Sequence, residues 1–180
     1  MKQLKYISTL ILAFMLATVL GCASTPKQEG TGEYFDDSAI TTKVKAAVFN
    51  EPSLKSSEIN VETFKGVVQL SGFVNSEADI KKAVAVARSV KGVTSVKNDM
   101  RVKSGTGEYV DDTVITTKVK AAIFNEPSLK SSEINVETFK GVVQLSGFVN
   151  SEADIKKAVD VARWVKGVTS VKNDMRVKGQ

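Results

Sequence analysis

The chain has 180 residues with 25 Lys and Arg, 20 Asp and Glu and no His, which gives a formal net charge of +5 at pH 7. The absence of histidine, together with a single cysteine, excludes the common zinc sites, histidine-activated nucleophiles and histidine acid–base catalysis. We therefore expect no metal or other cofactor. The charges are interspersed, whereas a nucleic-acid-binding protein would carry a stronger basic stripe, so we also expect no nucleic-acid partner.

Residues 1–21 have the features of an export signal. Lys2 and Lys5 give a positive start, and the apolar run 7–20 that follows is shorter than the roughly 20 residues of a transmembrane helix. Its end, the sequence VLGC that closes on Cys22, resembles the lipobox of bacterial lipoproteins. In such proteins the signal is cut before a cysteine that carries acyl chains such as palmitate, so we expect Cys22 to be lipidated.

The segment after the anchor indicates where the mature chain would lie. Removal of residues 1–21 takes away Lys2 and Lys5 and lowers the net charge from +5 to +3. Ala23 stands where the resemblance to Gram-negative lipoproteins would place an inner-membrane retention aspartate. The resemblance therefore implies the outer membrane, with the chain facing the periplasm. Residues 22–31 are polar without apolar periodicity, which predicts a flexible tether.

The rest of the chain is one sequence used twice. Residues 30–103 recur, shifted by 75 positions, as residues 105–178. The copies differ only at Phe35/Val110, Ser38/Thr113, Ala39/Val114, Val48/Ile123, Ala85/Asp160 and Ser89/Trp164. A repeat of this length exceeds a solenoid unit and is near the size at which a domain can close its own core. We therefore expect two tandem modules.

The first element of each module is an amphipathic helix. In the first copy it is expected to begin with Asp36 or Asp37 as its N-cap and to end at Pro52, with an apolar stripe at i, i+4, i+7 and i+8 from Ile40. Adjacent acids at a helix start satisfy free amides and the helix dipole, and side chains one residue apart diverge. Asp36-Asp37 and its copy Asp111-Asp112 are therefore interpreted as caps rather than as a catalytic pair.

A β-hairpin is predicted next. Residues 59–63 and 68–74 alternate between apolar and polar types, and the dipeptide Lys65-Gly66 between them suits a tight turn, where Gly66 can take a positive dihedral. Gly72 permits the close approach of another backbone or a bulge.

A second helix and a last strand complete the module. Ser76 and Asp79 have capping-box spacing before a second apolar stripe, and Gly92 is a suitable stop. Residues 96–102 alternate as a final strand. The predicted order is therefore helix, strand, strand, helix, strand.

These elements resemble the BON domain, a family named after bacterial osmotically-inducible and nodulation proteins. The matching residues are Ile59-Asn-Val-x-Thr-x-x-Gly66-x-Val-x-Leu-x-Gly72-x-Val74 and Gly92-Val93-x-x-Val96-x-Asn98-x-Met-x-Val102, which recur in the second copy. The resemblance implies an α+β fold with a three-stranded mixed sheet and two helices on one face, in module one (residues 32–103) and module two (residues 107–178). It also implies a non-enzymatic protein that binds phospholipid and maintains the envelope.

The alternation assigns one face of each sheet to the core. The predicted core residues, with equivalents 75 positions later, are Ile40, Val44, Val48, Ile59, Val61, Val68, Leu70, Val74, Ile80, Val84, Val90, Val96, Met100 and Val102. The opposite face is expected to be solvated, and its polar residues are Asn60, Glu62, Gln69, Ser71, Lys97, Asp99 and Arg101. Phe64, Val67 and Phe73 share that side, which leaves open whether it packs against the sister module or a partner.

The two differences in the second helix place new residues on its outward face. Asp160 and Trp164 replace Ala85 and Ser89, near Lys156 and Lys157, with Arg163 on the flank. Tryptophan is favoured at lipid headgroup depth and basic residues attract anionic lipid, so we interpret Trp164, Lys156, Lys157 and Arg163 as lipid-binding residues. Alternatively, Trp164 packs onto module one or another protein, or the change is drift.

The expected function is a lipid-anchored, non-enzymatic protein that binds anionic phospholipid and supports envelope integrity or stress tolerance. The alternative is a periplasmic interaction module that binds envelope proteins or polymers and touches lipid only through its anchor.

Overall fold

The computed structural model describes residues 31–103 and 111–179. The predicted export signal, Cys22 and the tether up to residue 30 lie outside the described residues. Both modules have the predicted order of elements, and the expectation of two tandem α+β units is confirmed.

The bounds of the elements repeat from one module to the other. Module one consists of α2 (Thr31–Phe49), the 3-10 turn η2 (Ser56–Glu58), β1 (Asn60–Phe64), β2 (Val67–Val74), α3 (Glu77–Arg88) and β3 (Ser95–Val102). Module two consists of α4 (Asp112–Phe124), η3 (Ser131–Glu133), β4 (Asn135–Phe139), β5 (Val142–Val149), α5 (Glu152–Arg163) and β6 (Ser170–Val177).

The middle strand of each sheet is the returning strand of the hairpin. β2 pairs antiparallel with β1 and parallel with β3, and β5 pairs with β4 and β6 in the same way. A parallel pair needs a crossover connection, which α3 and α5 supply. The mixed three-stranded sheet implied by the family resemblance is therefore confirmed.

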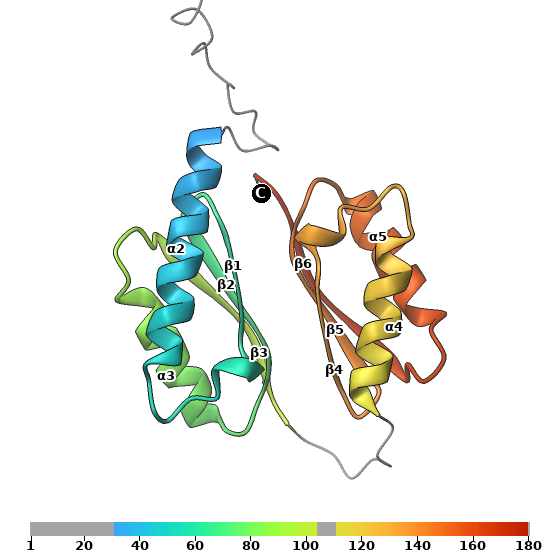
Figure 1. Cartoon of the computed structure of the whole chain (residues 1–180), viewed down its shortest axis with the longest axis horizontal. Coiled ribbons are helices and arrows are strands. Elements are labelled where there is room, and N and C mark those ends of the chain that lie inside the picture. The colour runs from blue at the N-terminus through green and yellow to red at the C-terminus, as the bar shows by residue number, and fades with distance from the viewer. Residues whose placement is uncertain (1–30, 104–110, 180) are drawn as a thin grey trace, which may run out of the picture.

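The modules form four layers, with the two sheets in the middle (Figure 1). Helices α2 and α3 cover the outer side of the first sheet, and α4 and α5 cover the outer side of the second. Each module buries its own apolar cluster between helices and sheet. The inner sides of the sheets face one another.

Most of the predicted core is confirmed. Ile40, Val44, Val48, Ile59, Val61, Val68, Leu70, Val74, Ile80 and Met100 are buried. By contrast, Val84, Val90, Val96 and Val102 are only partly buried against this cluster. Leu54 is buried although the prediction omitted it, and Ala83 and Ala87, which belong to the predicted apolar stripe of the second helix, are buried as well. The small side chains of Ala83 and Ala87 lie fully buried on the core face of α3, while Val84 lies at its edge.

The prediction that α2 begins after Asp36 or Asp37 is wrong, because the helix begins at Thr31. The buried carboxylate of Asp37 instead accepts hydrogen bonds from the backbone N–H groups of Lys65 and Gly66, the latter at 2.8 Å. These two bonds tie the helix to the hairpin turn.

In module two the predicted cap is confirmed. Asp111 is the N-cap of α4, and its side chain accepts from the backbone of Thr113 at 3.1 Å. Asp112 repeats the tie, accepting from the N–H groups of Lys140 at 2.7 Å and Gly141 at 2.9 Å. The second acid of each pair, Asp37 or Asp112, thus binds the backbone amides of the hairpin turn.

The two glycines singled out in the hairpin have the predicted roles. Lys65 and Gly66 have φ values of 50° and 75°, as a turn with two left-handed residues requires. A Cβ atom on Gly72 would lie 2.2 Å from the carbonyl oxygen of Glu58, so no larger residue fits there without movement of the backbone. Ser76 and Asp79 form the predicted capping box.

Candidate functional site

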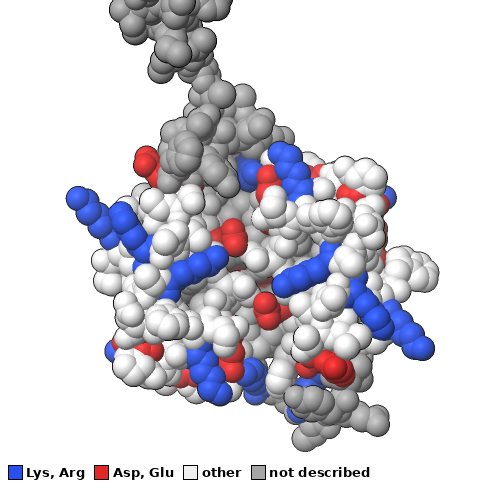
Figure 2. All heavy atoms as spheres, in the orientation of Figure 1, with Lys and Arg blue, Asp and Glu red and all other residues white. Residues whose placement is uncertain are grey.

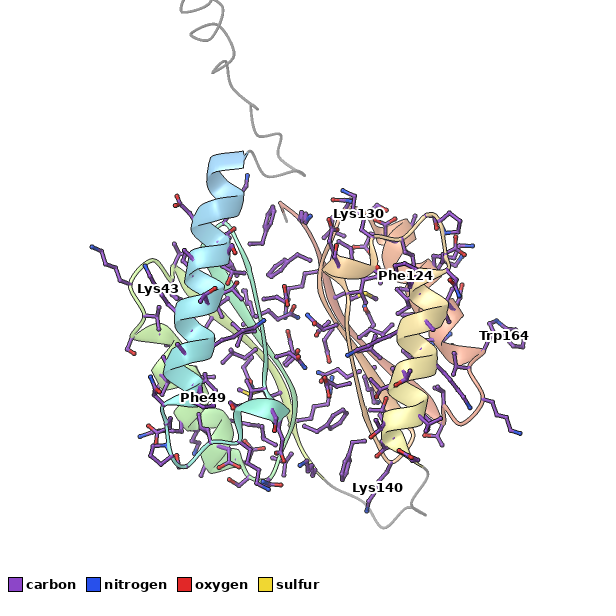
Figure 3. The ribbon with its side chains drawn as sticks, viewed as in Figure 1. Lys43, Phe49, Phe124, Lys130, Lys140 and Trp164 are labelled. Atoms are coloured by element: carbon purple, nitrogen blue, oxygen red, sulfur yellow. The ribbon has the colours of Figure 1, made fainter. Side chains whose placement is uncertain are left out.

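The outward face of α5 carries the only tryptophan of the chain. Trp164 is the C-cap residue of α5, and its side chain is 89% exposed. Figure 3 shows it projecting from the outer side of module two, away from module one. The alternative in which Trp164 packs onto module one is therefore wrong, since the modules meet on the opposite side of the sheet.

The basic residues predicted around Trp164 are all exposed. Lys157 pairs with Glu126 at 3.7 Å, whereas Lys156 and Arg163 form no ion pair within residues 31–103 and 111–179. The Ser128 hydroxyl donates to Glu126 at 2.8 Å and, together with Lys157, lowers the pKa of that carboxyl. Glu126 is therefore ionised at neutral pH and offsets part of the charge of Lys157.

These cations are part of a mixed surface. In the view of Figure 2, basic side chains project from both modules and acidic ones lie among them. Asp160 is exposed one helical turn before Trp164, and it is absent from module one, where Ala85 stands. The charge around Trp164 is thus weakly positive.

A second exposed aromatic was missed at the sequence level. Phe124, the last residue of α4, is 73% exposed and lines a shallow groove of about 500 Å³ with Lys120 and Asn135. Phe124 directly follows the buried Ile123, so its side chain points away from the apolar stripe of α4. A large apolar residue outside that stripe is the sequence signal that could have identified it. Because Glu126 follows closely and contacts Lys157 of α5, this end of α4 lies beside α5.

Phe49 is the counterpart of Phe124 in module one and is also 73% exposed. Module one has Ser89 in place of Trp164. The helical layer of module two therefore presents two exposed aromatic side chains, on α4 and α5, and that of module one presents Phe49 as its only large exposed aromatic among residues with described side chains.

The inner sheet face, predicted to be solvated, forms a seam between the modules that is closed to solvent at its centre. Gln69 and Ser71 are 1% and 2% exposed. The Gln69 side chain accepts from the N–H of Gly147 at 2.9 Å and donates to the carbonyl of Asp174 at 2.5 Å. Ser71 Oγ lies 2.7 Å from Ser146 Oγ.

Charged and aromatic pairs extend the seam on both sides of this centre. The Arg101 guanidinium donates to both carboxylate oxygens of Asp174, at 3.0 and 2.9 Å. The Phe64 ring stacks on Phe148 with centroids 5.6 Å apart. The prediction of solvation is wrong for Gln69, Ser71 and Asp99, because their polar groups find partners in the other module. The Arg101 side chain pairs with Asp174 but remains 41% exposed. Lys97 is exposed as predicted.

The described residues contain neither a membrane-spanning helix nor a cluster of potential metal ligands. No helix there is long and apolar enough to cross a membrane. In residues 31–103 and 111–179, no three or more Asp or Glu side chains cluster as metal ligands would.

The BON domain profile matches residues 36–104 and 111–179. The chain belongs to the BON family, as a tandem of two domains. It is 46% identical over 151 residues to Osmotically-inducible protein Y of Escherichia coli, and the aligned region covers 82% of this chain and 75% of that protein. It is 30% identical over 175 residues to Outer membrane lipoprotein DolP of Haemophilus influenzae, covering 91% of this chain and 89% of that protein.

A third relative is named as a hemolysin. The chain is 32% identical over 149 residues to a 21 kDa hemolysin of Actinobacillus pleuropneumoniae, covering 81% of this chain and 75% of that protein.

Proposed function

We propose that this BON protein is a non-enzymatic lipoprotein, anchored at the periplasmic side of the outer membrane through Cys22, whose second module binds anionic phospholipid. The outer layer of module two would lie against the membrane, with Trp164 at headgroup depth. In this role the protein supports envelope integrity under osmotic or related stress.

The observation that carries the proposal is the exposure of Trp164 beside cations. An indole that is 89% exposed leaves a large amphipathic surface uncovered, and such rings are favoured at membrane interfaces. Lys156 and Arg163 add attraction to anionic headgroups that salt weakens. Phe124 on the neighbouring helix supplies a second apolar group to the same layer.

The relatives support the cellular setting of the proposal. One is described as osmotically inducible and one as an outer membrane lipoprotein. The VLGC sequence at Cys22 is consistent with an outer membrane lipoprotein. Neither description names a lipid, so the assignment of anionic phospholipid rests on the chemistry of α5.

Co-sedimentation with vesicles tests the proposal on the chain from residue 22 onward with Cys22→Ser, which removes the anchor. We expect binding to phosphatidylglycerol vesicles at low salt and little binding to phosphatidylcholine vesicles. Trp164→Ser, which restores the residue of module one, should weaken binding about tenfold, since burial of part of the indole is worth about 1.4 kcal/mol.

Module one offers a matched control. Ser89 occupies the position of Trp164, at the end of the same helix with the same basic residues around it. Adding Ser89→Trp to the Trp164→Ser chain should therefore restore binding, through module one. Absence of vesicle binding by the Cys22→Ser chain at low salt would contradict the lipid assignment.

A second candidate function is supported by Asp160. Its carboxylate lies one turn from Trp164 and repels anionic headgroups, whereas an exposed aromatic beside mixed charges suits a protein partner. In this case the chain would bind an envelope protein or polymer and touch lipid only through Cys22. The Asp160→Ala variant distinguishes the two candidate functions. If lipid is the ligand, removing this carboxylate should strengthen binding to anionic vesicles.

A further inference from the structure

The contacts across the seam occur in reciprocal pairs. Arg101 donates to Asp174 at 3.0 and 2.9 Å, and Arg176, its counterpart 75 positions later, donates to Asp99 at the same two distances. The seam therefore has the pattern of an isologous interface, in which the same patch serves on both sides.

The uncharged contacts follow the same rule. Gly147 donates to Gln69 and Gly72 donates to Gln144, each at 2.9 Å. The Phe64–Phe148 ring pair recurs as Phe73–Phe139, both with centroids 5.6 Å apart. Ser71 and Ser146 are equivalent residues that contact each other and so mark the pseudo-two-fold axis.

The two patches are also identical in sequence. None of the six substitutions between the copies falls on a residue that makes these contacts. The inner faces of modules one and two are therefore chemically the same surface. Because these two faces fit each other within one chain, either face also fits the inner face of a module in a second chain.

We propose that the inner sheet face is a self-recognition surface whose partner is a second copy of this chain. Neighbouring chains assemble by exchanging modules, so that a module of one chain occupies the seam of another with the same contacts. The seam within one chain is favoured by the high effective concentration of linked modules, of millimolar order, so exchange requires crowded chains. This inference does not depend on lipid binding.

A pair of charge reversals in one module separates the two kinds of pairing. In the Asp99→Arg/Arg101→Asp chain, like charges meet across the internal seam, at positions 101 and 174 and at 99 and 176. Between two copies of this variant, however, opposite charges meet whenever like modules pair. The altered module one of one chain is complementary to the altered module one of the other, and the unaltered module two is complementary to the other unaltered module two. We expect this variant to form dimers or larger assemblies at concentrations at which the unaltered chain is monomeric, measured by light scattering on a sizing column.

The matched control is Arg101→Asp/Asp174→Arg, which has the same net charge and also loses one glutamine–aspartate hydrogen bond. It keeps opposite charges across the internal seam but places like charges together when identical modules meet. We expect it to remain monomeric. A folded Asp99→Arg/Arg101→Asp chain that stays monomeric at high concentration would overturn the proposal.

Cysteines on the axis test exchange without altering charge, and they decide the question if the charge variants do not fold. In Cys22→Ser chains, Ser71→Cys and Ser146→Cys each supply one thiol. The side-chain oxygens of Ser71 and Ser146 lie 2.7 Å apart, so the two thiols would meet across the seam. A concentrated mixture of the two chains should form a disulfide-linked dimer on oxidation. The chain carrying both cysteines is the positive control, because it can close the bond internally. If that control closes but the mixture yields no linked dimer, modules do not exchange and the proposal is wrong.

Discussion

Replacement of Gln69 by Ala probes the seam between the modules most sharply. The side chain is 1% exposed, accepts from the N–H of Gly147 at 2.9 Å and donates to Asp174 and Asp99. Its removal leaves the buried Gly147 N–H without its partner, which costs about 1–3 kcal/mol, and removes the net contribution of the other bonds, at about 0.5–1.5 kcal/mol each. We expect the free energy of unfolding to fall by about 2–6 kcal/mol.

Urea denaturation of the full chain measures this change. Gln144→Ala should cost the same within about 0.5 kcal/mol, because Gln144 makes the reciprocal contacts with Gly72 and Asp99. Lys81→Ala, on the exposed side of α3, should change stability by less than about 0.5 kcal/mol. A cost below about 0.5 kcal/mol for Gln69→Ala, or clearly unequal costs for the two glutamines, would refute the reciprocal seam.

Three further predictions concern the core, the turn and the anchor. Leu145→Ala, at a side chain with 0% exposure, should lower the free energy of unfolding by about 2–5 kcal/mol in urea denaturation, and an unchanged midpoint would contradict the strand register. Asp112→Ala should cost about 1–3 kcal/mol in the same assay, because it leaves two turn amides without their carboxylate partner, and a neutral result would contradict the tie between α4 and the hairpin. Intact mass of the membrane-extracted protein should show acyl chains on Cys22 as the first residue, and Cys22→Ala should abolish them; an unmodified thiol would contradict the anchor.

The elements and their register were predictable because one side of each sheet is mostly apolar, with Thr63 and Asn98 as its polar members in module one. Val61, Val68 and Leu70 alternate with polar residues, and this period fixes which side faces the helices. The capping box at Ser76 and the turn at Gly66 depend on residues close in sequence, so their roles also followed from the sequence.

The seam was not predictable in the same way because its partners lie far apart in the sequence. Gln69 and Asp99 are residues typical of a solvated face, and only their reciprocal pairing with the other module removes them from water. Phe64 and Phe73 on the same side were the available signal. The early start of α2 was missed because Asp37 looked like a cap, whereas its ligands are amides of the hairpin turn.

At the candidate site, the sequence correctly placed Trp164 and Asp160 on the outward face of α5, because a single helix repeats every 3.6 residues. It missed Phe124, which lies at a helix end, and the pairing of Lys157 with Glu126, which joins two different elements.

The fluorescence of Trp164 tests the lipid assignment most directly, because it is the only tryptophan in the chain and reports on the proposed contact itself. In buffer its 89% exposure predicts emission typical of a solvated indole. On addition of phosphatidylglycerol vesicles to the Cys22→Ser chain at low salt, we expect the emission to shift to the blue and the shift to be reversed by high salt. Emission that stays unchanged at saturating vesicle concentration would contradict insertion of this residue and with it the proposed lipid-binding face.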